Sequence, residues 1–350
     1  MNFKRAATVV FLIKEDSLIA YHFIDHVSCA ISLKVLELLM SLSDWESIDS
    51  IRSGGIFDAA ELPQILLSLL ESGFIVAEGT EQNLRDVDYN EVWEWGVIAG
   101  LFHFSIKNAT WVDQHQSNQF VELRFEGRRP PPFFEDYSSE PDSIALSRNV
   151  GRDELLALMA RRRSCREFSR TDSLGIDVLS DCLFAGFGIT EVCGAPPLGP
   201  YPLKMTPSGG ARNPYDVVVY VRDVSSLNSG VYRYSPFSHS LIKFSHDFLP
   251  SIVDVLAGQA WADDAAAVVF LIAQFERTMW KYPHPGAYRV VMMEAGHIAQ
   301  NMVLVATKNQ VRSVTTAAIN DELAEKAFVV SSITQSVCYA VALGMPPCSS

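Results

Sequence analysis

Basic residues are scarce in this 350-residue chain. It has 28 Lys and Arg against 41 Asp and Glu, a formal charge of −13. A general nucleic-acid binder needs a basic face that displaces counterions, so the acidic balance argues against that class. Long apolar runs are also missing, since none approaches the roughly 18 to 20 residues of a membrane-spanning helix. The apolar stretch from Ala6 to Ile13 has no small-residue cleavage site after it, so we expect no signal peptide.

Paired cysteines are another absence. The six cysteines, at positions 29, 165, 182, 193, 338 and 348, form no CxxC motif. In a chain of this length that pattern indicates reduced thiols in a cytoplasmic protein, not a disulfide scaffold or a zinc site, and we expect no metal. The hydrophobic fraction of 48% is enough for a substantial folded core. The length favours two domains or one large one.

The first 90 residues predict a separate small domain. "TVVFLI" (8–13) predicts a buried strand, and "SLKVLELLMSL" (32–42) has helical apolar spacing with Ser32 as N-cap. "DAAELPQILLSLLESG" (58–73) predicts a second helix, with Asp58 and Glu61 as a capping box and Gly73 as its stop; "FIVAEG" then predicts a strand. This order is typical of a winged helix. A packing module or a site for a peptide or partner fits better than DNA binding, because neither helix has a basic face.

Residues 91–150 predict a connector. "WEWGVIAGLFHFSIKNATW" (93–111) is dense in aromatic residues and is expected to pack one domain on the other. His103 within it is most simply a hydrogen-bonded core histidine. "GRRPPPFFEDYSSEPDS" (127–143) is rich in proline, acids and serine and predicts a linker, where we place the domain boundary.

Residues 151–350 predict an α+β domain. Helices are expected at 151–164, at 176–189 with flanking glycines, and at 289–309, where the apolar density indicates a buried central helix. Buried strands are expected at 215–223 and 265–275, and a hairpin at 229–245.

Three elements of this domain carry possible chemistry. "RRRSCREF" (161–168) follows a helix. In an extended chain Arg162, Ser164 and Arg166 point to one side and suit a phosphate, although a basic helix end complementing its own dipole is an equal alternative. "TPSGGARNPYD" (206–216) is either an ordinary turn or a loop whose backbone approaches a ligand. It is neither a Walker loop nor a dinucleotide fingerprint, because no Gly-Lys-Ser/Thr follows and it precedes a strand. Lys281 and Tyr282, in a loop between a core strand and the buried helix, are either an acid–base pair or a solvated Lys beside a packed Tyr.

In this order and spacing, these elements resemble the FMN-dependent nitroreductase superfamily. More closely, they resemble its SagB/ThcOx-type branch, the azoline dehydrogenases of thiazole- and oxazole-modified peptides. "RRSCREF" is similar to the "R-x-S-x-R/K-x-F" opening of that fold, and "PSGGARNPYD" to its "PS-x-G-x-x-x-P-x-E/D" segment. "KYPHPGAYRVVMMEAGHIAQN" is similar to "KYG-x-R-x-YR…E-x-GH-x-x-QN", and "GVYRYSPFSHSL" to "GLYHYDPxxHxL".

The resemblance implies a dimeric nitroreductase-like FMN domain, with a mainly antiparallel sheet flanked by helices, behind a winged-helix-like domain. It implies that Lys281 and Tyr282 are the catalytic pair and that FMN lies at the subunit interface of a homodimer. The implied FMN contacts are Arg162, Ser164, Arg166, Pro207, Ser208, Gly209, Gly210, Asn213, Ala317 and Ala318. The implied activity is oxidation of a peptide- or carrier-bound azoline to an azole in natural-product (RiPP) biosynthesis, with a possible partner enzyme.

Three departures from the pattern leave the substrate open. Pro283-His284-Pro285-Gly286 replaces Gly-x-Arg after Lys281-Tyr282. Ala211-Arg212-Asn213-Pro214 replaces Ala-Leu-Tyr-Pro and adds a charge. "TTAAIND" (315–321) stands where the family has a Gly-Gly-Phe-like stretch near the reactive flavin nitrogen. Two alternatives remain: a nitro or quinone reductase that uses NAD(P)H, and a catalytically silent scaffold that binds a peptide or a partner enzyme.

Overall fold

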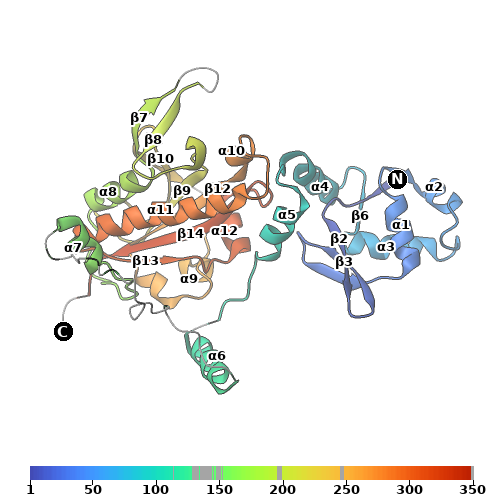
Figure 1. Cartoon of the computed structure of the whole chain (residues 1–350), viewed down its shortest axis with the longest axis horizontal. Coiled ribbons are helices and arrows are strands. Elements are labelled where there is room, and N and C mark those ends of the chain that lie inside the picture. The colour runs from blue at the N-terminus through green and yellow to red at the C-terminus, as the bar shows by residue number, and fades with distance from the viewer. Residues whose placement is uncertain are drawn as a thin grey trace.

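The computed structural model describes residues 1–112, 114–127, 153–194, 199–244 and 248–347, with the single residues 134, 144, 146 and 151. In Figure 1 a small N-terminal unit lies beside a larger domain formed by the second half of the chain. Between them in sequence come helices α4 (Glu81–Val92), α5 (Gly96–Ser105) and α6 (Gln114–Gly127). Within the described residues, no helix is both long and apolar enough to cross a membrane. The linker predicted at 127–143 falls almost entirely outside the described residues.

The N-terminal unit combines two small antiparallel sheets with three helices. The sheets have the orders β5-β1-β6 and β2-β3-β4. The strands are β1 (Asn2–Arg5), β2 (Val9–Lys14), β3 (Ser17–His22), β4 (Val27–Ala30), β5 (Glu46–Ser47) and β6 (Ile75–Ala77), and the helices are α1 (Leu33–Ser41), α2 (Ile48–Ser53) and α3 (Leu62–Glu71). Leu38, Leu39, Leu66 and Phe74 are fully buried in its core. The three helices packed with β5 and β6 agree with the winged-helix-like prediction.

Local sequence signals explain two of the predicted helix boundaries. Ser32 caps α1 as predicted, because its Oγ accepts a first-turn backbone N–H at 3.3 Å. Gly73, with φ of 71°, follows the end of α3 as predicted. The capping box predicted for Asp58 and Glu61 is wrong. Helix α3 begins at Leu62 without a side-chain cap, because the Glu61 N–H, which the Asp58 side chain would accept in a capping box, donates to the Asp58 backbone carbonyl at 3.0 Å.

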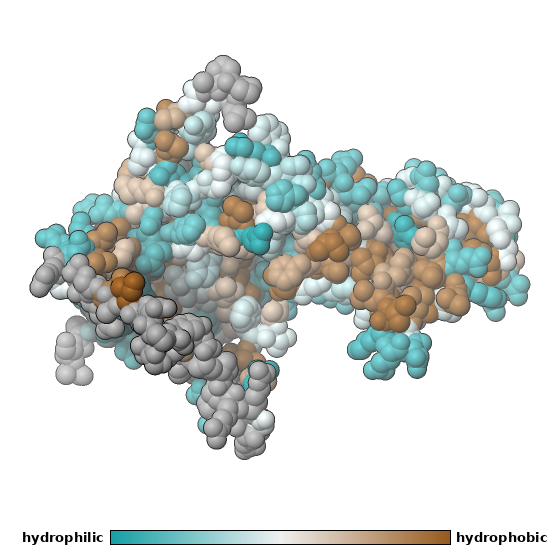
Figure 2. Space-filling model, in the orientation of Figure 1, coloured by the Kyte–Doolittle hydropathy of each residue, from teal (hydrophilic) through white to brown (hydrophobic). Residues whose placement is uncertain are grey.

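Strand β2 exists as predicted but is not buried. Val9 lies in the core, whereas Leu12 and Ile13 are 47% and 84% exposed. The reason is that the strand runs away from the core into a tight hairpin turn, since Lys14 pairs with Ser17 of β3. Figure 2 shows apolar residues gathered over this unit and its junction with the larger domain.

The aromatic stretch 93–111 packs the two parts of the chain together, as predicted. Trp95 is buried and donates its Nε1–H to the backbone carbonyl of Tyr282 at 2.9 Å. His103 is also buried, with Nδ1 3.1 Å from the hydroxyl of Tyr288, which confirms a hydrogen-bonded core histidine. Burial holds the pKa of His103 well below its ordinary value, so the ring is neutral near pH 7.

The larger domain is built on a six-stranded antiparallel sheet with the order β11-β10-β9-β12-β14-β13. Its strands are β9 (Tyr215–Val221), β10 (Gly230–Ser235), β11 (Ser240–Phe244), β12 (Ala267–Gln274), β13 (Arg312–Thr316) and β14 (Gln335–Gly344). Helices α8 (Ile176–Phe187) and α11 (Ala287–Lys308) pack on one face; α9 (Ile252–Val255) and α12 (Asp321–Phe328) pack on the other. The predicted α+β fold, with helices flanking an antiparallel sheet, is confirmed.

The remaining elements frame one edge and one end of this domain. Helix α7 (Glu154–Arg161) precedes the basic turn, and α10 (Phe275–Met279) precedes Lys281. The hairpin of β7 (Ile189–Cys193) and β8 (Tyr201–Lys204) projects from the domain in Figure 1 and leads into the glycine loop. Helix α11 passes close to both the basic turn and the glycine loop, so it is the common support of the candidate site.

Candidate functional site

The basic turn lies against the edge of the main sheet. After α7 ends, the chain is extended: Ser164 bridges to Ser313 of β13, and the Cys165 N–H donates to the Ser313 carbonyl at 2.9 Å. This places Arg162 and Ser164 on the wall of one cavity of about 80 Å³. The other lining residues come from α11, β13 and β14: Gly296, Ala299, Gln300, Val303, Ser313, Val314, Thr315 and Tyr339.

The other arginines of the turn have different surroundings. Arg163 turns back toward the helix and donates from one terminal nitrogen to the carbonyls of Ala160 at 2.8 Å and Arg162 at 2.7 Å. It therefore stabilises the carboxyl end of α7, as the helix-dipole interpretation expects. Arg166 is exposed and is not among the residues that line the cavity. The structure thus brings together two of the three side chains predicted to hold a phosphate.

The glycine loop packs closely against α11 and Tyr282. Ser208 Oγ accepts the Asn213 N–H at 2.8 Å and so fixes the turn, within which Gly210 has φ of 60°. A Cβ at Gly209 would lie 2.5 Å from Val290 Cγ1, and one at Gly210 would lie 2.3 Å from the Tyr282 hydroxyl. Both positions therefore need glycine for packing, whether or not a ligand also approaches.

Lys281 meets this loop at a second and much larger cavity. Its Nζ donates to the Gly210 carbonyl at 3.3 Å and lies 5.5 Å from the centre of the Tyr282 ring. Lys281, Gly210 and Asn213 all line a hollow of about 710 Å³, a size typical of small-molecule sites. The Tyr282 carbonyl accepts a hydrogen bond from the Trp95 Nε1–H, so the connector also fixes the backbone of the loop that carries Lys281 and Tyr282.

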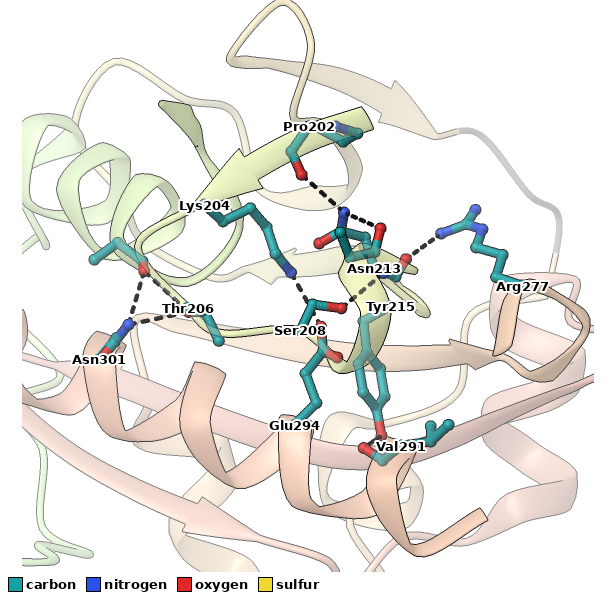
Figure 3. Close-up of polar contacts among 12 residues, drawn as sticks. Pro202, Lys204, Thr206, Ser208, Asn213, Tyr215, Arg277, Val291, Glu294 and Asn301 are labelled. Carbon is teal, nitrogen blue, oxygen red and sulfur yellow. Dashed lines mark hydrogen bonds and ion pairs between the residues drawn. The ribbon is translucent and has the colours of Figure 1, made fainter. Parts of the chain in front are cut away.

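A buried ion pair beside this cavity was not predicted from the sequence. Lys204 Nζ lies 3.2 Å from Glu294 Oε1, and their side chains are 6% and 3% exposed. Burial lowers the pKa of Lys204, and the Glu294 carboxylate opposes that shift. Figure 3 shows the pair joining β8 to α11 next to Ser208. Glu294 belongs to the "EAGH" motif, but no sequence signal marked Lys204 as its partner.

Two further arginines border the same cavity. Arg277 donates to the Asn213 carbonyl at 3.0 Å and forms an ion pair with Asp216 at 2.7 Å. Arg212 donates its Nε–H to the Arg277 carbonyl at 2.6 Å, and its guanidinium carbon lies 4.8 Å from the centre of the Trp280 ring. Arg212, noted above only as a departure from the family pattern, is thus positioned by two neighbours, Arg277 and Trp280.

The remaining predicted contacts lie elsewhere. The Ala318 N–H donates to Thr316 Oγ1 at 3.0 Å, and its carbonyl accepts from Gln259 Nε2 at 3.1 Å, so its backbone is already engaged. Ala317 and Pro207 are exposed, and neither they nor Ala318 line the two cavities. Among the described residues, no three His, Cys, Asp or Glu side chains cluster as metal ligands would.

Comparison with known proteins places these cavities in context. The family model described as "Nitroreductase family" matches residues 159–345. MJ1384 of Methanocaldococcus jannaschii, named as a nitroreductase, is 34% identical over 165 residues, which are 47% of this chain and 78% of that protein. The residues matched by the family model therefore include those that line both cavities but not the N-terminal unit.

Other relatives are named for peptide processing. The trifolitoxin-processing protein TfxB of Rhizobium leguminosarum bv. trifolii is 29% identical over 39% of this chain and 38% of its own. The microcin B17-processing protein McbC of Escherichia coli is 34% identical over 29% of this chain and 39% of its own. The chain thus matches well under half of each. A structure of the E. coli microcin synthetase McbBCD complex with truncated pro-MccB17 aligns over 77% of this chain and 98% of that one, with TM-score 0.55 and 22% identity, and so shares the fold.

Proposed function

The chain belongs to the nitroreductase family, which confirms the resemblance found in its sequence, and from this premise we propose that it is an FMN-dependent dehydrogenase. We propose further that it oxidises an azoline to an azole on a peptide or carrier-bound substrate. The observation that carries the proposal is the meeting of Lys281 with the glycine loop at one cavity of about 710 Å³. A base and a ligand-sized hollow are the two features that such a reaction needs from the protein.

The residues around the smaller cavity suit the phosphate of FMN. Arg162 offers a permanently charged guanidinium, and Ser164, Gln300 and Thr315 add neutral donors on the same wall. The cavity of about 80 Å³ is far below the roughly 300 Å³ at which small-molecule sites begin, so it suits a phosphate and not a tricyclic ring. We therefore propose that the ring lies outside it, at the boundary of a homodimer, where the glycine loop of the partner subunit covers it.

Lys281 and Tyr282 supply the proton chemistry in this proposal. An azoline that becomes an azole loses two hydrogens, one as hydride and one as a proton. FMN, when bound, supplies the hydride acceptor. Lys281 takes the proton from the ring carbon, and the Tyr282 hydroxyl, beside Gly210, orients that exchange. The buried Lys204–Glu294 pair holds the glycine loop in place below them.

The relatives support a peptide substrate. Two are named as processing proteins of trifolitoxin and microcin B17, and the aligned McbBCD complex has a truncated pro-peptide bound. We propose that the N-terminal unit of this chain holds a substrate peptide or a partner enzyme. The scattered, unpaired cysteines of the described residues support a reducing, cytoplasmic setting.

Cofactor content and product mass test the proposal together. The purified protein is expected to be yellow and to convert a synthetic thiazoline peptide to a product lighter by two hydrogens. Arg162→Ala should weaken FMN binding about 10- to 100-fold, because a charge-assisted contact is lost. Arg161→Ala, in the exposed last turn of α7, is the matched control and should keep the flavin. A colourless protein that takes up no FMN would remove the proposal, and fast bleaching by NAD(P)H alone would favour a nitro or quinone reductase.

A further inference from the structure

The large cavity carries an excess of positive charge that its own ion pairs do not balance. Besides Lys281, which acts as the base in its uncharged form, three cations line it, namely Lys204, Arg212 and Arg277, but only one carboxylate, that of Asp216. Asp216 pairs with Arg277, and Glu294, just behind the wall, pairs with Lys204. Arg212 remains without a carboxylate partner among the described residues. In a chain of net charge −13, this local excess indicates selection for a negative ligand.

Arg212 is held rigidly but keeps its terminal nitrogens for a ligand. Its Nε–H donates to the Arg277 carbonyl at 2.6 Å, and its guanidinium stacks over the Trp280 ring at 4.8 Å. No described residue accepts a hydrogen bond from its two terminal nitrogens. A guanidinium fixed in this way loses little side-chain entropy on binding, and its two end groups match the two oxygens of a carboxylate.

We propose that Arg212 binds a carboxylate of the substrate, and so selects azolines that carry a negative charge beside the ring. This inference rests on the proposed function and names the substrate class of that same cavity. Lys281 lines the same cavity as Arg212, so the proposed carboxylate contact and the proposed base belong to one binding site. The carboxylate belongs either to a free azoline-4-carboxylic acid or to an acidic residue that follows the azoline in a peptide.

Matched substrates test this directly in the FMN-loaded protein. The first pair is a thiazoline-4-carboxylic acid and its primary amide. The second pair is a thiazoline peptide with Asp or with Asn next to the ring. We expect about a 10- to 100-fold preference in kcat/KM for the charged member of one pair, expressed mainly in KM. The pair that shows the preference identifies the source of the carboxylate.

Two variants separate recognition from folding and cofactor binding. Arg212→Gln should abolish this preference, so that kcat/KM for the charged substrate falls to that for its neutral partner measured in the same variant, with full FMN content. Arg233→Gln is the control, because Arg233 also stacks on an aromatic ring, that of Phe244 at 4.4 Å, but lies outside this cavity. It should keep the preference.

Each other outcome counts against a different claim. Equal rates within both pairs would overturn the inference, and so would loss of FMN in Arg212→Gln, which would assign Arg212 to the cofactor. If the flavin is bound but no azoline is oxidised, the proposed function fails. Calorimetric binding of the same pairs then decides the inference, since a carboxylate site must still bind the charged member more tightly.

Discussion

Lys204 and Glu294 form an ion pair at 3.2 Å with almost no access to water, and it joins the strand before the glycine loop to the central helix. Two charges removed from water are tolerated only because each satisfies the other. The pair fixes where β8 ends, and four residues later Ser208 begins the turn that brings Gly210 to Lys281. The geometry of the candidate site thus depends on a contact outside the reacting groups.

Breaking this pair from one side should destabilise the protein strongly. Glu294→Gln leaves the Lys204 ammonium buried without a counter-charge, at an expected loss of about 3–5 kcal/mol in the free energy of unfolding. The double variant Lys204→Met/Glu294→Leu removes both charges and should lose much less. Urea unfolding of the three proteins measures the difference. If Glu294→Gln is as stable as the wild type, Lys204 is not held as a buried cation.

Acidification should weaken the junction between the N-terminal unit and the larger domain through His103. The folded protein keeps this buried ring neutral, whereas in the unfolded chain it gains a proton below its ordinary pKa of about 6.5. The unfolded state then binds more protons than the folded state, so the free energy of unfolding decreases as the pH decreases. The loss begins near pH 6.5 and amounts to about 2 kcal/mol between pH 7 and pH 5.

The variant His103→Asn isolates this effect. Asn keeps a polar atom near the Tyr288 hydroxyl but does not titrate. The free energy of unfolding of the variant should therefore depend less steeply on pH than that of the wild type, and the difference in slope should correspond to about one bound proton. Other groups with shifted pKa values, such as His22 and Glu325, are present in both proteins and cancel in the comparison. Parallel pH profiles would mean that His103 is not held neutral.

The sequence predicted what local patterns encode. Apolar periodicity located α8, α11, β9 and β12, and the motif order identified the family. What failed depended on tertiary contacts. A backbone hydrogen bond to the Asp58 carbonyl forms in place of the predicted capping box, and the far end of β2 runs beyond the core. Strands β13 and β14 were not predicted.

The candidate site shows the same division. Residue types predicted a phosphate contact for Arg162 and Ser164 and a base at Lys281, but they did not predict which cavity each side chain lines. Alternation alone placed Arg166 with Arg162, whereas the bridge from Ser164 to Ser313 sets the actual course of the chain. The Lys204–Glu294 pair joins residues 90 positions apart, and only the packing of β8 on α11 brings them together.

Lys281→Ala should retain FMN but lose turnover. If Lys281 is the base, its removal should lower the rate of azoline oxidation about 10²- to 10⁴-fold. Tyr282→Phe keeps the ring against Gly210 and the carbonyl bonded to Trp95, so it should lose less. Lys308→Ala, at the exposed end of α11, is the control. Single-turnover decay of the flavin band measures each rate, and an unimpaired Lys281→Ala protein would assign this lysine a structural role.

Mixed dimers test whether Arg162 and Lys281 serve the same site from different subunits. The two residues line separate cavities of one chain, and the proposed dimer combines the smaller cavity of one subunit with the larger one of its partner. At an FMN concentration that saturates the wild type but not Arg162→Ala, the Arg162→Ala and Lys281→Ala proteins should each have little activity alone.

If the two are unfolded, mixed equally and refolded with FMN, random pairing makes half of the dimers mixed, each with one intact site. The mixture should recover about a quarter of wild-type activity. Replacing one partner by the double variant Arg162→Ala/Lys281→Ala is the control and should recover none, because no site then holds both residues. If the equal mixture also stays inactive while size-exclusion chromatography shows dimers, both residues must come from one subunit, and the flavin ring must lie within a single chain, alongside α11.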